Sequence, residues 1–91
     1  MSKFLGGSAK SMANQLMEGY ILINRSKLRL YTLEELRSLK AELEKLQREL
    51  RAQQIPLEDT QAIQMKNHRM QKIGTALLLI RSHCMKAFRM V

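Results

Sequence analysis

Residues 32–77 decide the fold of this chain, and they read TLEELRSLKAELEKLQRELRAQQIPLEDTQAIQMKNHRMQKIGTAL. Leucine recurs at steps of three and four residues from Leu33 to Leu50, which is the spacing of one helix face. Thr32 stands before this run and Glu35 follows three residues later, which is the pattern of a capping box. Pro56 disfavours helical geometry at the residue before it. The sequence therefore predicts a helix over residues 32–54.

A second helix is predicted over residues 56–90. Pro56 can open it, because the first position of a helix needs no backbone N–H donor. Apolar residues recur at helical spacing from Ile63 onward. When the chain folds back at the proline, the two apolar seams superpose in one antiparallel register, with Leu43 opposite Met70 in one of its layers.

One layer of this register is polar. Lys66 falls opposite Leu46, so the lysine ammonium group is expected to reach outward, toward Glu42 or Glu49. Each large apolar side chain buried in the other layers contributes roughly 1.5–3 kcal/mol. The hairpin is therefore expected to close on itself.

The first thirty residues are predicted to form a helical arm. Met12, Leu16 and Tyr20 recur at helical spacing within residues 8–24. Residues 24–27 are expected to be a connection, and residues 27–30 a short extended approach to the next helix. The predicted fold is all-α: a long antiparallel two-helix hairpin (about 32–54 and 56–90) with an N-terminal helical arm (about 8–24). The predicted division is a basic arm over 1–26 and a hairpin with a C-terminal extension over 27–91.

The charge of the chain is strongly basic and uneven. The 91 residues carry a formal net charge of +8. Residues 1–31 and 55–91 each carry a net charge of +4, whereas residues 32–54 hold five bases and five acids. A basic excess of this size favours a polyanionic partner, either nucleic acid or an anionic membrane surface.

Several function classes are not expected. There is no glycine-rich phosphate loop and no plausible Ser/His/Asp set, and the acidic pairs Glu34-Glu35 and Glu58-Asp59 suit helix starts. An enzyme, a cofactor, a metal site and a small-molecule substrate are therefore not predicted.

Cys84 is the single cysteine, which excludes an internal disulfide. No apolar run approaches the length of a membrane span, and a secretory signal is not expected. A membrane is not the favoured partner, although the arm or the tail could lie on anionic lipid as an amphipathic helix.

Two basic clusters are candidates for phosphate contact. Lys66, His68, Arg69 and Lys72 lie within two turns of the second helix, where the alternative is an ordinary solvated face. Arg25, Lys27 and Arg29 precede Thr32. Both clusters on one rigid hairpin suit the backbone of a folded RNA, where contacts go to phosphates rather than to base edges.

The hairpin resembles the universal large-subunit ribosomal protein twenty-nine family. The resemblance covers about residues 27–80 and is carried by Leu28-Arg29, Thr32, Glu34-Glu35-Leu36, Glu42-Leu43, Leu50-Arg51-Ala52-Gln53, Leu57-Glu58-Asp59, Ile63, Met70 and Lys72-Ile73-Gly74-Thr75. The chain departs from the family where Ala62, Gln64, Asn67 and Leu78 replace usual arginines, and where Lys66 replaces an apolar residue.

The resemblance implies a structural constituent of the large ribosomal subunit that binds rRNA. It also implies large-subunit protein twenty-three as a neighbour. A mitochondrial ribosome is the preferred setting because extended forms occur in organelles, and a cytoplasmic or other organelle ribosome is the alternative. The residues expected to contact phosphate are Arg25, Lys27, Arg29, Arg51, Lys66, His68, Arg69 and Lys72. The alternative is a coiled-coil subunit of a protein-only assembly that docks through Leu78, Leu79, Met85 and Phe88, a face that helix 8–24 could instead cover.

Overall fold

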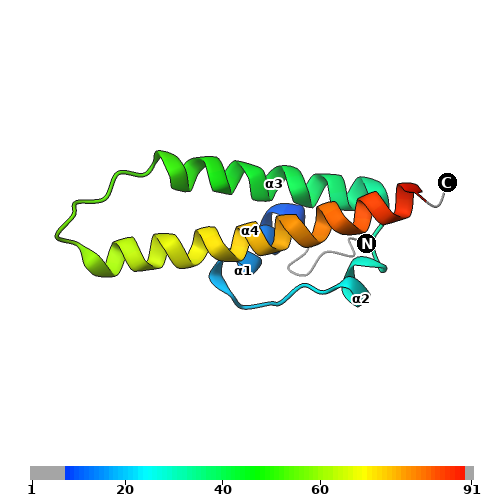
Figure 1. The fold of residues 1–91 in the computed structure, drawn as a ribbon, viewed down its shortest axis with the longest axis horizontal. Coiled ribbons are helices and arrows are strands. Elements are labelled where there is room, and N and C mark those ends of the chain that lie inside the picture. The colour runs from blue at the N-terminus through cyan, green and yellow to red at the C-terminus, as the bar shows by residue number, and fades with distance from the viewer. Residues whose placement is uncertain (1–7, 90–91) are drawn as a thin grey trace.

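The structure, a computed structural model, describes residues 8–89. Four helices follow one another along this part of the chain: α1 (Ala9–Glu18), α2 (Arg25–Leu28), α3 (Leu33–Ala52) and α4 (Thr60–Arg89). Helices α3 and α4 form a long antiparallel hairpin, and α1 packs against both of them (Figure 1). The described residues include no strand, and the predicted all-α hairpin is confirmed.

Helix α3 begins as its sequence predicts. The backbone N–H of Glu35 donates to Thr32 Oγ1 at 3.2 Å, and the Thr32 N–H donates to Glu35 Oε1 at 2.7 Å. Each side chain therefore satisfies a backbone donor of the other residue, which is the reciprocal arrangement of a capping box. Glu34 and Glu35 lie in the first turn. Their negative charges interact favourably with the positive end of the helix dipole there.

Tyr31, which precedes this cap, links the stability of the fold to pH. Burial raises the pKa of Tyr31 above 10.0, and the charge of Glu35 raises it further. A raised pKa in the folded state stabilises the fold below the unfolded pKa, and this contribution is lost as the pH rises through the folded pKa. We expect the free energy of unfolding to fall above pH 10 by more in the wild-type chain than in Tyr31→Phe. Urea unfolding at about pH 8 and about pH 11 measures the difference between the two proteins.

The connection between α3 and α4 is longer than predicted. Helix α3 ends at Ala52, two residues before its predicted end, and α4 begins at Thr60, four residues after its predicted start. Pro56 does not open the second helix, because its carbonyl accepts the N–H of Asp59 at 3.0 Å and closes a turn. The Asp59 carboxylate then caps α4 by accepting the N–H of Ala62 at 3.1 Å. A side-chain acceptor at the cap stabilises a helix start, which Pro56 could not provide.

Helix α1 ends earlier than predicted, at Glu18 instead of residue 24. Ser8 caps its start by accepting the N–H of Ser11. Gly19 ends it with a φ of 82°, a left-handed conformation that costs glycine least. The helical spacing of Tyr20 with Leu16 is therefore not used, and residues 22–24 continue outside any helix.

Helix α2 replaces the connection and the extended approach expected over residues 24–30. The Asn24 side chain accepts the N–H of Lys27 at 2.9 Å, and the Asn24 carbonyl accepts the N–H of Leu28 at 3.1 Å. This short helix places the side chain of Leu28 in the core, where it is fully buried. Leu30 remains 66% exposed, so the predicted alternation does not hold here.

The core lies where α1, α3 and α4 meet. Its buried side chains are Met12, Ala13 and Leu16 of α1, Leu28 of α2, Leu36, Leu39, Leu43 and Leu50 of α3, and Ile73, Ala76, Leu77 and Ile80 of α4. Both predicted seams thus face inward, and α1 contributes a third wall to the same core. The proposed division at residue 26 stays a prediction. No helix in the described range is long and apolar enough to cross a membrane.

The hairpin opens toward the connection between α3 and α4 (Figure 1). Ile63 is only half-buried there, and Lys66 stands on the seam. The Lys66 ammonium donates to the carbonyl of Gln53 at 2.8 Å. The expectation that it reaches Glu42 or Glu49 is therefore not met, since the exposed carbonyl at the end of α3 lies within its range. The positive charge of Lys66 also interacts favourably with the negative end of the α3 helix dipole.

The apolar face of α4 that was predicted as a docking surface is only partly exposed to solvent. Leu78 is 66% exposed, whereas Leu79 is half-buried and packs against the core. The side chains of Met85 and Phe88, also assigned to this face, lie outside the described residues. The expected docking surface thus shows one exposed leucine in the described part.

Two glycines give opposite predictions for the same substitution. A Cβ at Gly74 would meet no atom within 4 Å, so Gly74→Ala should raise the free energy of unfolding by about 1 kcal/mol. Gly19→Ala should lower it by about 1–2 kcal/mol, because alanine is strained at a φ of 82°. Urea unfolding followed by circular dichroism measures both changes. Destabilisation by Gly74→Ala would contradict the open space at that position.

Candidate nucleic-acid interface

The basic residues predicted before Thr32 lie around α2. Arg25 begins α2, and its side chain lies outside the described part of the chain. The Lys27 ammonium donates to the Leu22 carbonyl at 2.8 Å, which ties α2 to the preceding connection. Arg29 is exposed in the turn after α2. Lys27 and Arg29 therefore remain accessible, although Lys27 also has a structural contact.

Two of the predicted residues on α4 have partners within the chain. Arg69 Nε lies 3.0 Å from Glu18 Oε1, and Arg69 Nη2 lies 3.4 Å from Glu18 Oε2. This two-point contact joins the end of α1 to α4, and at about one-third exposure it contributes about 1 kcal/mol or less. Lys66 donates to the carbonyl of Gln53. The side chains of Lys66 and Arg69 therefore already make contacts within the fold.

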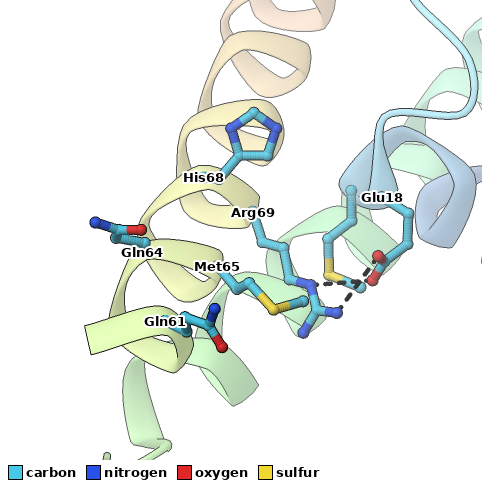
Figure 2. Close-up of a pocket in the computed structure, with 7 residues that line it drawn as sticks. Glu18, Gln61, Gln64, Met65, His68 and Arg69 are labelled. Atoms are coloured by element: carbon cyan, nitrogen blue, oxygen red, sulfur yellow. Dashed lines mark hydrogen bonds and ion pairs between the residues drawn. The ribbon is translucent and has the colours of Figure 1, made fainter. Parts of the chain in front are cut away.

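The Glu18–Arg69 pair borders an open hollow between the end of α1 and the first turns of α4. Figure 2 shows Glu18 and Arg69 facing each other, with Met65, Gln61, Gln64 and His68 projecting from α4. The hollow has a volume of about 640 Å³ and is also lined by Met17. Its ionisable side chains are Glu18, His68 and Arg69, and two of these three neutralise each other. No group of three or more His, Cys, Asp or Glu side chains in the described residues could hold a metal ion.

His68 and Lys72 line a second hollow, under the connection that follows α1. It has a volume of about 190 Å³, and Ile21, Leu22 and Ile23 form its other wall. His68 is exposed and Lys72 is half-buried. The α4 cluster therefore divides: His68 and Lys72 face apolar side chains of the connection, whereas Lys66 and Arg69 have partners within the chain.

The remaining predicted residue, Arg51, belongs to a row of bases on α3. A helical step of about 100° per residue places Arg37, Arg48 and Arg51 within about 60° of one another, away from the leucine seam. Lys40 lies beside them, and Glu44 projects between Arg51 and Arg37 on the same side of the helix. We call Arg37, Lys40, Arg48 and Arg51 the α3 basic flank.

The other side of α3 carries the opposite charge. The same helical step groups Glu34, Glu42 and Glu49 within about 80° of one another, with Lys45 beside them. These three glutamates are the α3 acidic flank. The equal numbers of bases and acids in α3 therefore do not make a uniformly balanced helix. They form one lateral surface with a basic excess, which includes Glu44, and another with an acidic excess, which includes Lys45.

The arginines of the basic flank are available to a ligand. Arg37, Arg48 and Arg51 are all exposed. Across residues 8–89, no carboxylate lies within 4.0 Å of their guanidinium groups, although Glu44 lies one turn before Arg48. At a rise of about 1.5 Å per residue, the row from Arg37 to Arg51 spans about 21 Å. Guanidinium groups arranged in this way suit bidentate contact with several phosphates of a nucleic acid.

Sequence reasoning missed Arg37, Lys40 and Arg48. The net charge of residues 32–54 is zero, and this sum conceals how the bases are distributed around the helix. The signal was present in the sequence, because a helical projection separates these bases from the glutamates of the acidic flank. The structure adds that the leucine seam fixes α3 in the orientation that turns its arginines to solvent.

Comparison of the chain with protein-family models, with curated proteins and with solved structures finds no match.

Proposed function

We propose that this protein binds the phosphate backbone of a structured RNA and acts as a structural component of a ribonucleoprotein. The α3 basic flank is the primary contact, and Lys27, Arg29, His68 and Lys72 are secondary contacts. The observation that carries this proposal is the row of exposed arginines at positions 37, 48 and 51, which have no carboxylate partner in the described residues.

The charges favour RNA over a protein partner. Together the two ends of the chain add a net charge of +8 to a helix whose own charges cancel. A protein partner would have to supply a matching acidic surface along about 21 Å of α3. A nucleic-acid backbone provides regularly spaced negative charge without any such requirement, and released counterions favour the contact.

The proposed setting is the large ribosomal subunit. The hairpin resembles the large-subunit protein twenty-nine family in its capped first helix, in its Leu50-Arg51-Ala52-Gln53 ending and in its Lys72-Ile73-Gly74-Thr75 return segment. The resemblance suggests large-subunit protein twenty-three as a neighbour, and a mitochondrial ribosome as the compartment. Helix α1 would be an addition to the family hairpin.

Sedimentation of a cell lysate tests this setting. A tagged copy of the chain should sediment with large ribosomal subunits, and nuclease digestion of the RNA should release it. Separate gradients for mitochondrial and cytosolic extracts assign the compartment. A nuclease-resistant complex containing only proteins would contradict the proposal and favour the alternative, a subunit of a protein-only assembly.

A further inference from the structure

We propose that residues 19–31 dock this protein on the surface of an anionic lipid bilayer. These residues comprise the connection after α1, helix α2 and the turn into α3, and we call them the 19–31 edge. Figure 1 shows that the connection and α2 run beside α4, on the side away from α3. This docking is separate from the primary RNA contact proposed on α3, but it uses Lys27 and Arg29, which are proposed as secondary RNA contacts.

The apolar part of the edge faces solvent. Tyr20 is 79% exposed, Leu22 is 65% exposed and Leu30 is 66% exposed, although all three are large apolar side chains. Ile21 and Ile23 alternate with the first two and pack against the core. The inward isoleucines therefore anchor the connection and hold Tyr20 and Leu22 outward. Three exposed apolar side chains within thirteen residues are available for contact with an apolar phase.

The charged part of the edge complements an anionic surface. Arg25, Lys27 and Arg29 lie in the edge, and it contains no Asp or Glu. Lys27 and Arg29 are exposed. The Lys27 ammonium donates to the Leu22 carbonyl at 2.8 Å, so a base lies directly beside one of the exposed leucines.

The surface of an anionic bilayer can contact both the exposed apolar side chains and the bases of the edge. Anionic headgroups attract Lys and Arg, and the headgroup–acyl boundary accepts leucine and tyrosine side chains. Tyrosine in particular favours this boundary, because its ring is apolar and its hydroxyl remains hydrated. RNA phosphates would bind the bases but would give Leu22 and Leu30 no apolar contact. Docking on the surface also agrees with the lack of any membrane-crossing helix in the described residues.

Vesicle flotation of the full chain tests the proposal. The wild-type protein should float with vesicles of phosphatidylcholine that contain about 30% phosphatidylserine, and should not float with phosphatidylcholine alone. Arg29→Gln should weaken partitioning about five-fold, since each base near an anionic surface contributes a factor of that size. Equal flotation with both vesicles, or none with either, would overturn the proposal.

Two double variants separate the edge from general hydrophobicity. Leu22→Ser with Leu30→Ser should reduce partitioning about ten-fold or more. Leu57→Ser with Leu78→Ser is the matched control, because these leucines are 87% and 66% exposed but lie outside the edge. The control should change partitioning by less than about two-fold. Equal losses in the two double variants would rule out the edge as the docking surface.

A fluorescent reporter checks that the edge itself enters the bilayer. The chain contains no tryptophan, so Tyr20→Trp introduces a single indole at an exposed position. Its emission should shift to shorter wavelength with anionic vesicles and should be quenched by brominated acyl chains. The Leu22→Ser/Leu30→Ser variant should keep its affinity for RNA. A loss of RNA binding without any lipid binding would instead assign the edge to the RNA interface.

Discussion

Replacing Leu16 by alanine is expected to lower the free energy of unfolding by about 2–5 kcal/mol. Leu16 is 4% exposed and lies in the core between the two long helices. Its truncation removes apolar burial and leaves a cavity that α1 can only partly collapse to fill. A domain of this length has about 5–14 kcal/mol of stability in total. The expected loss is therefore a large fraction of the total stability.

Urea unfolding at equilibrium measures this loss, and Lys10→Ala provides the control. Lys10 lies on the same helix but is exposed, so its substitution should change stability by less than about 0.5 kcal/mol. A similarly small change for Leu16→Ala would show that α1 is not part of the cooperative core. The hairpin of α3 and α4 would then be stable without the packing of α1 against it.

Replacing Arg37, Arg48 and Arg51 together by glutamine is expected to weaken binding to double-stranded RNA about 10²–10³-fold at 0.1 M salt. Each neutralised phosphate contributes about an eight-fold factor at this salt concentration, through release of a condensed counterion. Glutamine keeps a high helix propensity at these positions but removes the charge. Because all three side chains are exposed, the fold should be unchanged, which circular dichroism and urea unfolding verify.

The α3 acidic flank offers a control of equal size on the same helix. Replacing Glu34, Glu42 and Glu49 by glutamine also changes three charges, but it should leave RNA affinity unchanged or increase it. A charge reversal at Lys66 and Arg69 would be a weaker test, since both residues hold structural contacts. If the arginine variant kept wild-type affinity while the fold was intact, the α3 basic flank would not be the RNA contact.

The features that the sequence predicted well depend on neighbouring residues. The capping box at Thr32 needs only Glu35, and the inward face of α3 needs only the leucine spacing. Gly19 and Asp59 were equally local signals for a helix end and a helix start. They override the helical spacing of Tyr20 and the helix start expected at Pro56.

The remaining features depend on tertiary packing. Glu18 and Arg69 are 51 positions apart in the chain, so their contact follows only from how α1 lies on α4. Lys66 finds the Gln53 carbonyl because the connection is longer than predicted and the hairpin opens there. Lys66 and Arg69 of α4 thus have partners within the chain, whereas the arginines of α3 remain available to a ligand.

The salt dependence of RNA binding tests the proposed contact most directly. The affinity of the wild-type chain and of the Arg37/Arg48/Arg51→Gln variant is measured for one RNA duplex over a series of salt concentrations. Binding through the α3 arginines predicts that the logarithmic slope of the variant is smaller in magnitude by about three, one for each lost phosphate contact. Identical slopes for the two proteins, or a wild-type affinity that does not depend on salt, would contradict it.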